Sequence, residues 1–197
     1  KSLMKQIGNF GTVFMWAKHE NTVLADIFRQ MQEYGHEDSE LMGWLDAMTK
    51  KEKEESYTMV DMCELTRAYY FHPEMKGKTS LKSVLPAVWK NYPNIKATPW
   101  LAKYYKDGEQ GKVLNPYETL PPIDVGDRNE VVRDGTQAMR AYNEMMIGLH
   151  RHDLATRDKW VDLLKQYCEL DTMAMVIVWK YWERKMGLKN ISLPQRF

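Results

Sequence analysis

The fold class is decided by a short apolar run, Thr12-Val13-Phe14-Met15-Trp16, which follows Gly11. Its apolar and partly β-branched residues predict a buried strand of the parallel type. A second short strand is predicted at residues 57–62 (YTMVDM), after two intervening helices. Because strands that are separated by helices pair through a crossover connection, the pattern predicts a helix-rich α/β fold with a short parallel sheet.

Helices are predicted on both sides of the first strand. Residues 1–7 carry their apolar side chains on one face and end at Gly8, a plausible left-handed stop. A helix over residues 21–34 and another that begins at Ser39, a good N-cap, follow the strand. The charged run at residues 50–55 is interpreted as a solvated helix end. Since the chain opens inside a helix without an initiator Met, we expect it to be the C-terminal portion of something longer.

The second half of the chain is predicted to be mostly helical, and residues 1–197 are predicted to form one domain. Residues 80–91 show helical spacing, and Pro86 within them predicts two short helices, with Pro86 in the first turn of the second. Residues 93–128 are rich in Pro, Gly and Tyr and are predicted to form a long loop region. Helices are predicted from about residue 133 and from about residue 156 to residue 186.

The composition is that of an ordinary globular chain, with 44% hydrophobic and 28% charged residues. The net charge of +1 gives no global basic field, so a nucleic-acid partner would have to meet a local patch. Only Cys63 and Cys168 occur, which suits a reducing cytoplasm rather than a disulfide framework or a zinc site. No apolar stretch is long enough to span a bilayer, so no membrane partner is expected. The oligomeric state is left open.

A carboxylate interrupts the apolar stripe that is predicted for the last helix. The stripe runs through Trp160, Leu163 and Tyr167, and the position that should continue it is Asp171. A carboxylate on a core-facing line is costly unless it is hydrogen-bonded, paired with a cation or bound to a metal ion. Tyr167 stands one turn earlier, so its hydroxyl and the carboxylate can converge on one site. The structural alternative is a buried ion pair beside a core tyrosine.

A second carboxylate, Glu20, continues the apolar stripe of the helix after the first strand back to the strand-to-helix junction. Ligand sites in parallel α/β folds lie at the carboxyl ends of strands, which makes this position a candidate. The alternative is that Glu20 simply favours a helix N-terminus, where a carboxylate meets the positive end of the helix dipole.

Two short motifs resemble those of the DEDD exonucleases of the tyrosine type, which have a ribonuclease H-like (DnaQ-like) fold. Residues 167–172 (YCELDT) are similar to the third motif of that superfamily, in which an Asp follows a Tyr by four positions on the last helix. Residues 19–24 (HENTVL) lie where its second motif would lie, and the strand that ends Val60-Asp61-Met62 resembles its next strand. The resemblance implies an incomplete fold of this type, with the N-terminal strands outside the chain.

A closer resemblance covers nearly the whole chain and is to a bacterial family of domains of unknown function, numbered 2779. The features that carry it are residues 20–24, 60–62, 70–73, 77–86, 115–117, 120–121, 134–135, 138–142, 167–172 and 174–176.

Together these resemblances imply a metal-dependent 3′–5′ exonuclease that hydrolyses phosphodiester bonds in single-stranded DNA or RNA. Glu20 and Asp171 would be metal ligands, and Tyr167 would orient the attacking water. Two Mg²⁺ or Mn²⁺ ions supply hydroxide and stabilise the leaving oxygen in such chemistry, and these cations prefer oxygen ligands.

The chain departs from the superfamily in its ligand set. It has no Asp-x-Glu at a place equivalent to the first motif, and Asp61 is the remaining candidate ligand, although that position is more often structural. We therefore expect the chain to be inactive alone and to depend on an N-terminal nuclease-like region of the same protein. The alternative function is a non-catalytic nuclease-fold module that binds nucleic acid or acts as a scaffold.

Basic and aromatic residues elsewhere leave further alternatives open. Lys76, Lys78 and Lys82 lie near aromatic residues and suit a groove that follows a nucleic-acid strand, although a solvated loop explains them too. Tyr117 and its aromatic neighbours in the long loop region are expected to cover the core, with base stacking as the alternative.

Overall fold

The computed structural model describes residues 1–52, 58–92, 98–126, 128–149 and 151–187 of the chain. Its contacts divide the chain into two compact units, Lys1–His72 and Pro73–Phe197, and the single domain expected from the sequence stays a prediction. Each unit has its own secondary structure and its own packing, and each is described by itself. No helix in the described ranges is both long enough and apolar enough to cross a membrane.

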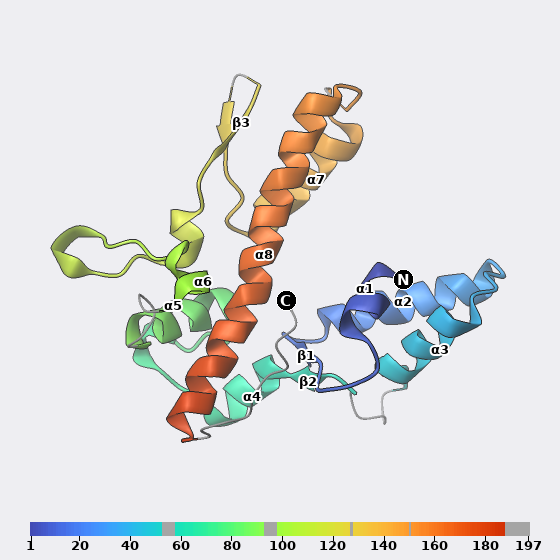
Figure 1. The fold of residues 1–197 in the computed structure, drawn as a ribbon, viewed down its shortest axis with the longest axis horizontal. Coiled ribbons are helices and arrows are strands. Elements are labelled where there is room, and N and C mark those ends of the chain that lie inside the picture. The colour runs from blue at the N-terminus through green and yellow to red at the C-terminus, as the bar shows by residue number, and fades with distance from the viewer. Residues whose placement is uncertain (53–57, 93–97, 127, 150, 188–197) are drawn as a thin grey trace. The chain divides into compact units, whose positions relative to one another are not determined.

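The first unit is a helix-rich α/β arrangement with a very short parallel sheet (Figure 1). Strand β1 (Phe14–Met15) pairs with β2 (Val60–Asp61) in parallel, with Phe14 opposite Val60 and Met15 opposite Asp61. The predicted parallel pair is therefore confirmed, although each strand is shorter than predicted. Its helices are α1 (Ser2–Ile7), α2 (His19–Glu33), α3 (Ser39–Met48) and α4 (Met62–Tyr69).

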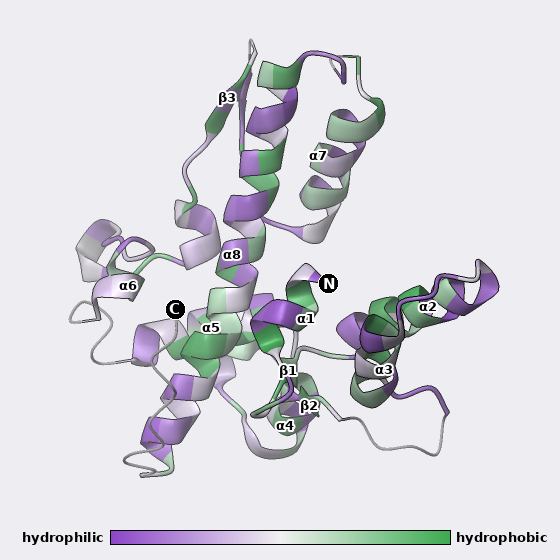
Figure 2. Cartoon of the chain, turned by 45° about the vertical axis from the view of Figure 1, so that its right-hand side comes forward, coloured by the Kyte–Doolittle hydropathy of each residue, from purple (hydrophilic) through white to green (hydrophobic). Residues whose placement is uncertain are grey.

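The core of the first unit lies where α1, α2 and α3 meet. Met4, Met31, Trp44 and Leu45 are buried there, and Leu24 and Phe28 pack against them. Figure 2 shows the hydrophobic residues of α2 and α3 along these helices. The apolar stripe predicted for residues 21–34 thus forms part of the core, except that Ile27 is 40% exposed.

The helix ends of the first unit follow the predicted chemistry with two corrections. Helix α1 ends at Gly8 as predicted, and its φ of 68° is one that favours glycine, but its ψ of −156° lies outside the left-handed helical region. The N-cap of α3 is Asp38 and not Ser39, because the Asp38 carboxylate accepts a hydrogen bond from the Leu41 amide at 3.1 Å. The cap position is one residue earlier because Ser39 has already entered the helix.

The second unit is built around the long helix α8 (Leu154–Lys185). Helices α5 (Leu81–Asn91) and α7 (Gly135–Ile147) pack against α8, and an antiparallel hairpin of β3 (Ile123–Val125) and β4 (Arg128–Glu130) contacts it through β3 (Figure 1). The predicted loop region over residues 93–128 contains short elements as well: α6 (Pro99–Ala102) and the 3₁₀ turns η2 (Glu109–Gly111) and η3 (Pro116–Thr119). A further 3₁₀ turn, η1 (Pro73–Met75), packs on α5.

Helix α5 corrects the prediction of two short helices, because it continues without interruption past Pro86. Proline in a helix interior removes one backbone hydrogen bond and crowds the preceding turn, at a cost of about 3 kcal/mol. Burial outweighs that cost here, since Val84, Leu85, Ala87, Val88 and Trp89 are all at most 1% exposed.

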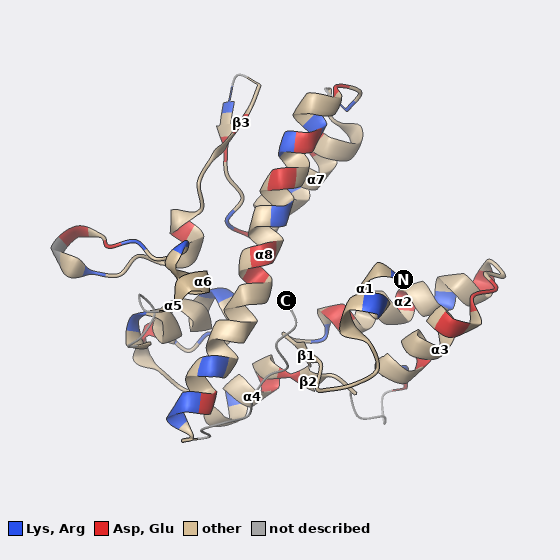
Figure 3. Ribbon diagram, in the orientation of Figure 1, with Lys and Arg blue, Asp and Glu red and all other residues tan. Residues whose placement is uncertain are grey.

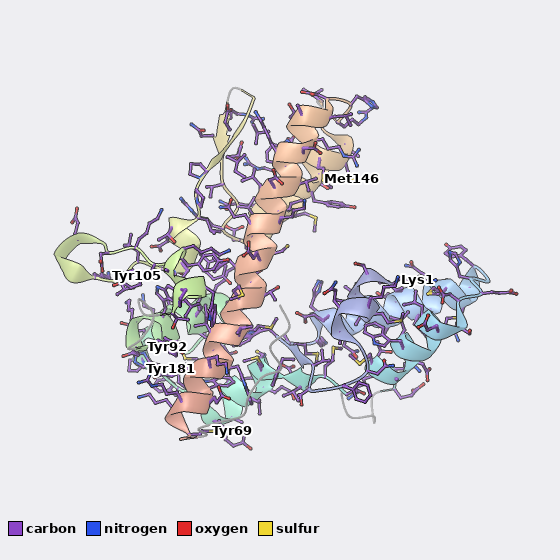
Figure 4. The ribbon with its side chains drawn as sticks, viewed as in Figure 1. Lys1, Tyr69, Tyr92, Tyr105, Met146 and Tyr181 are labelled. Carbon is purple, nitrogen blue, oxygen red and sulfur yellow. The ribbon has the colours of Figure 1, made fainter. Side chains whose placement is uncertain are left out.

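Helix α8 also corrects the stripe that was predicted for it. Leu170 is completely buried, whereas Asp171 is only partly buried, so the core line passes through Leu170 and the carboxylate lies at its margin. Toward the end of α8 the Tyr181 ring lies 6.3 Å from the ring of Tyr92, and both are labelled in Figure 4. Figure 3 shows charges of both signs along α8.

Candidate functional site

A cluster of four side chains forms the candidate site in the second unit. Tyr167 and Asp171 project from α8, Tyr117 comes from η3 and Lys82 from the first turn of α5. The Tyr117 hydroxyl donates a hydrogen bond to Asp171 Oδ1. Lys82 Nζ donates to the Tyr167 hydroxyl at 2.8 Å. We call these four residues the Lys82–Asp171 cluster.

Aromatic rings surround the lysine of this cluster. The Lys82 ammonium lies 4.7 Å from the centre of the Tyr167 ring and 5.4 Å from that of the Tyr117 ring. The two rings are 6.4 Å apart and tilted by 48°. A cation at such distances from aromatic faces is attracted by the ring quadrupoles, more strongly where water is partly excluded. The tyrosines therefore help to hold the ammonium in place.

Local structure fixes each member of the cluster. Tyr117 is 3% exposed, and its backbone amide is held by the Asn115 side chain at 3.2 Å, which caps η3. Tyr167 and Asp171 stand four residues apart on α8, so they share one helix face. Lys82 lies in the first turn of α5, where the positive end of the helix dipole disfavours a cation. Its position therefore has to be supported by the neighbouring tyrosines and by Asp171.

The electrostatics of the cluster are dominated by burial and by Asp171. Burial raises the pKa of Tyr117 and of Tyr167 well above 10.0, and the Asp171 carboxylate raises both further. Burial lowers the pKa of Lys82, and the charges of Asp171 and Asp134 oppose that effect. Both tyrosines thus remain protonated at neutral pH.

Glu20 lies in the first turn of α2, in the first unit, as the sequence predicted. Its Oε2 atom is buried and has no hydrogen-bond partner among the described residues. A buried carboxylate oxygen without a hydrogen-bond donor costs free energy. This oxygen is therefore a candidate ligand for a bound cation. The buried side chain next to it is Asn21, which the sequence did not single out. Asn21 is bonded through both polar atoms to the Lys50 backbone, at 2.8 and 3.0 Å.

Asp61 has a structural role in the first unit. Its Oδ1 accepts hydrogen bonds from the amides of Cys63 at 2.8 Å, Glu64 at 3.3 Å and Ala17 at 3.0 Å. It therefore caps α4 and ties the segment after β1, where Ala17 has a positive φ of 63°, to the end of β2. This agrees with the structural alternative for Asp61, and its role as a metal ligand stays a prediction.

The predicted site residues are divided between the two units. Glu20 and Asp61 belong to the first, and Tyr167 and Asp171 belong to the second. The structure brings Tyr167 and Asp171 into one cluster, as their spacing predicted. The meeting of Glu20 with Asp171 requires the two units to come together and stays a prediction.

The donor types at these positions fit a hard cation. Carboxylate oxygens are the ligands that Mg²⁺ and Mn²⁺ prefer, and Glu20 offers a buried oxygen without a donor. Within either unit, however, the described residues contain no group of three or more His, Cys, Asp or Glu side chains that could hold a metal ion. The described residues of either unit therefore do not provide a complete ligand set of the kind that the resemblance implies.

Two members of the cluster, Lys82 and Tyr117, were not predicted as site residues. Lys82 was weighed only as part of a basic groove or a solvated loop, and Tyr117 as a cover for the core. Their signal was present in the segments that carry the family resemblance, since residues 77–86, 115–117 and 167–172 all contribute to the cluster. Spacing along the chain gave no indication that these segments meet.

Residues 1–80 match the model of a family described as "Domain of unknown function (DUF2779)". This supports the family resemblance over the first 80 of 197 residues. The matched segment includes Glu20 and Asp61 and ends before Lys82. No curated protein and no solved structure matches the chain.

Proposed function

We propose that the chain is part of a ribonuclease H-like, metal-dependent nuclease domain that hydrolyses phosphodiester bonds of single-stranded DNA or RNA from the 3′ end. The observation that carries the proposal is the arrangement of Tyr167 and Asp171. A hydroxyl and a carboxylate share one face of α8 in a partly open cluster, at the four-residue spacing of the tyrosine-type exonucleases. The parallel pair β1–β2, with Glu20 just after β1, is a second supporting feature.

In this proposal Glu20 and Asp171 hold the cation, with Asp61 as a third candidate ligand. Bound Mg²⁺ or Mn²⁺ would supply a hydroxide nucleophile and stabilise the leaving oxygen. Asp61 is the weakest candidate because three backbone amides already occupy its Oδ1. Glu20 is the stronger one because its Oε2 has no donor among the described residues.

The side chains of the cluster would position the reacting groups. Since Tyr167 accepts a hydrogen bond from Lys82, its own hydroxyl hydrogen is left to point toward Asp171 or toward a water molecule at the site. Tyr117 donates to Asp171 Oδ1 and thereby restrains the carboxylate, which would leave Oδ2 to the metal ion. A fixed hydroxyl beside a fixed carboxylate is what orienting an attacking water requires.

Titration of Mn²⁺ into the chain, followed by electron paramagnetic resonance, tests the metal-binding part of this proposal. We expect weak binding that Asp171→Ala abolishes. Asp162→Ala is the matched control, because Asp162 lies on the same helix in an exposed position about 4.0 Å from Lys165. Equal Mn²⁺ binding by the wild type and both variants would contradict the role of Asp171.

Hydrolysis is tested with single strands labelled at either end, in Mg²⁺, for the 197-residue chain alone and for the chain joined to a nuclease-like region that carries the Asp-x-Glu motif. We expect shortening from the 3′ end by the joined protein and little activity from the chain alone. A joined protein that binds the strands but never shortens them would favour the alternative, a non-catalytic module. That alternative is supported by Lys82, whose positive charge interacts favourably with the Asp171 carboxylate and can partly balance its negative charge without a metal ion.

A further inference from the structure

We propose that the outer face of α7 is a surface on which a second copy of this chain docks, so that the chain forms a two-fold symmetric dimer through its second unit. The apolar side chains of this face are Met139, Tyr142, Met146 and Ile147, which we call the α7 stripe. The inference goes beyond the proposed function, and it requires neither a metal ion nor a nucleic acid.

The α7 stripe lies on the side of the helix that faces away from α8. Ala141, on the opposite side, is completely buried, and α7 packs along α8. Met139, Tyr142 and Met146, the last labelled in Figure 4, are 62%, 48% and 47% exposed. Ile147 is 72% exposed. Single exposed apolar side chains are common, but a contiguous row of them along one helix face marks an interaction site.

The spacing and composition of the face indicate that its partner is a helix of another protein chain. Met139, Tyr142 and Met146 stand three and four residues apart, which is the spacing of the apolar seam between paired helices. Met and Tyr are enriched in protein interfaces, whereas most charged residues are depleted. Of the exposed side chains of α7, only Arg140 is charged, and it is paired with Glu130. The face therefore offers no unpaired cation to a nucleic acid.

The shape of the face fits a second copy of itself. Tyr142 and Met146, four residues apart, form a ridge along one side of the face. On the other side is an open depression of about 440 Å³, whose lining includes Asn143 and Ile147. A two-fold axis that runs along α7 places the ridge of each copy opposite the depression of the other. Such self-complementarity is what a two-fold interface requires.

The exposed apolar area matches what a stable dimer needs. Two leucines that follow the stripe in the chain, Leu149 and Leu154, are 94% and 68% exposed. With them, the stripe exposes on the order of 700 Å², against roughly 800 Å² that each partner buries in a stable interface. The net charge of the chain is only +1, so two copies repel each other little.

Sedimentation velocity of the 197-residue chain, in EDTA and over a range of micromolar concentrations, tests the inference. We expect a species of twice the chain mass that dissociates on dilution. Met146→Glu should weaken association at least about a hundredfold, because two-fold symmetry places the new carboxylate in the interface twice. Ile147→Glu, on the side of the depression, should have the same effect. Met186→Glu is the matched control, because Met186 is a methionine of similar exposure, 59%, at the end of α8.

A second variant keeps the test independent of folding effects. Met146→Gln is uncharged and of similar size, and it should weaken association about tenfold, since an apolar contact is lost in both copies. The inference is overturned if Met146→Glu, with a melting temperature like that of the wild type, associates as tightly as the wild type. It is also overturned if the wild type stays monomeric, which would leave the stripe to a different protein. The Mn²⁺ result for Asp171 is unaffected by any of these outcomes.

Discussion

Tyr117 and Asp171 are 54 residues apart in the sequence and are joined by a hydrogen bond from the tyrosine hydroxyl to the carboxylate. This bond connects η3, within the region predicted as a loop, to the middle of α8. It gives the carboxylate a donor from a distant part of the chain, so the loop region helps to organise the candidate site.

Tyr117→Phe should lower the free energy of unfolding by about 1–2 kcal/mol, because a partly buried carboxylate loses a donor while the ring and its packing remain. Equilibrium denaturation measures this change. Tyr105→Phe is the control, since the Tyr105 hydroxyl donates at 2.6 Å to Asp107 in an exposed pair, which should contribute little. An equal decrease in the free energy of unfolding for the two variants would show that the Tyr117 hydrogen bond stabilises the fold no more than an exposed one does.

Alkaline pH should destabilise the second unit. The pKa values of Tyr117 and Tyr167 are raised above the ordinary value of 10.0, chiefly by burial and then by Asp171. Above pH 10 the unfolded chain releases these protons and the folded chain keeps them, so stability is complete below pH 10 and falls as the pH rises further. Lys82 acts in the opposite sense, since its lowered pKa makes stability rise with pH up to about 10.5.

The measurement is the tyrosinate absorbance of the native protein against pH, together with denaturation at each pH. Of the eleven tyrosines, we expect Tyr117 and Tyr167 to ionise only when the protein unfolds. The double variant with Phe at both positions should lose less stability above pH 10 than the wild type. An equally steep loss in that variant would place the alkaline transition elsewhere in the molecule.

Local signals allowed much of the first unit to be predicted from the sequence. Gly8 at the end of α1 and the parallel pairing of the two strands follow from backbone preferences and from the order of elements, and both are confirmed. The errors arose where tertiary packing outweighs a local signal. Pro86 would break an isolated helix, but the buried side chains on both sides of it keep α5 continuous.

Only the two members of the candidate site that lie on the same helix could be predicted from the sequence to be neighbours. Tyr167 and Asp171 are neighbours through helical spacing, so their proximity follows from the sequence. Lys82 and Tyr117 reach the same place through the packing of α5 and η3 in the second unit, which no period in the sequence encodes. The placement of Asp171 at the margin of the core and not within it was likewise decided by the packing of Leu170.

Asp61 offers a test that separates a capping role from a metal-binding role. Asp61→Ala should lower the free energy of unfolding by about 1–2 kcal/mol, the typical cost of removing an N-cap. Asp61→Asn should change it by less than about 0.5 kcal/mol, because asparagine caps helices as well as aspartate does. Stability is read from denaturation, and Mn²⁺ binding is measured on the same samples. Loss of Mn²⁺ binding in a stable Asp61→Asn protein would make Asp61 a ligand despite its structural role.

Asn21 should be the polar side chain on which the first unit depends most. It is 7% exposed, and its amide oxygen and nitrogen bond the N–H and the carbonyl of Lys50, 29 residues away. These two bonds connect the start of α2 to the chain just beyond α3. Asn21→Ala should therefore cost about 2–3 kcal/mol, since two buried hydrogen bonds are lost together. Thr22→Ala is the control, because the exposed Thr22 hydroxyl donates to the Lys18 carbonyl within the same helical turn.

Amide hydrogen exchange shows which helices Asn21→Ala destabilises. Protection of amides in α2 and α3 should fall, while amides in α7 and α8 keep theirs, because the latter belong to the other compact unit. Asn21→Asp sharpens the test. Its carboxylate still accepts from the Lys50 amide, but its second oxygen faces the Lys50 carbonyl and repels it, so this variant should be no more stable than Asn21→Ala at neutral pH. An Asn21→Asp protein as stable as the wild type would show that the contact with the carbonyl contributes nothing.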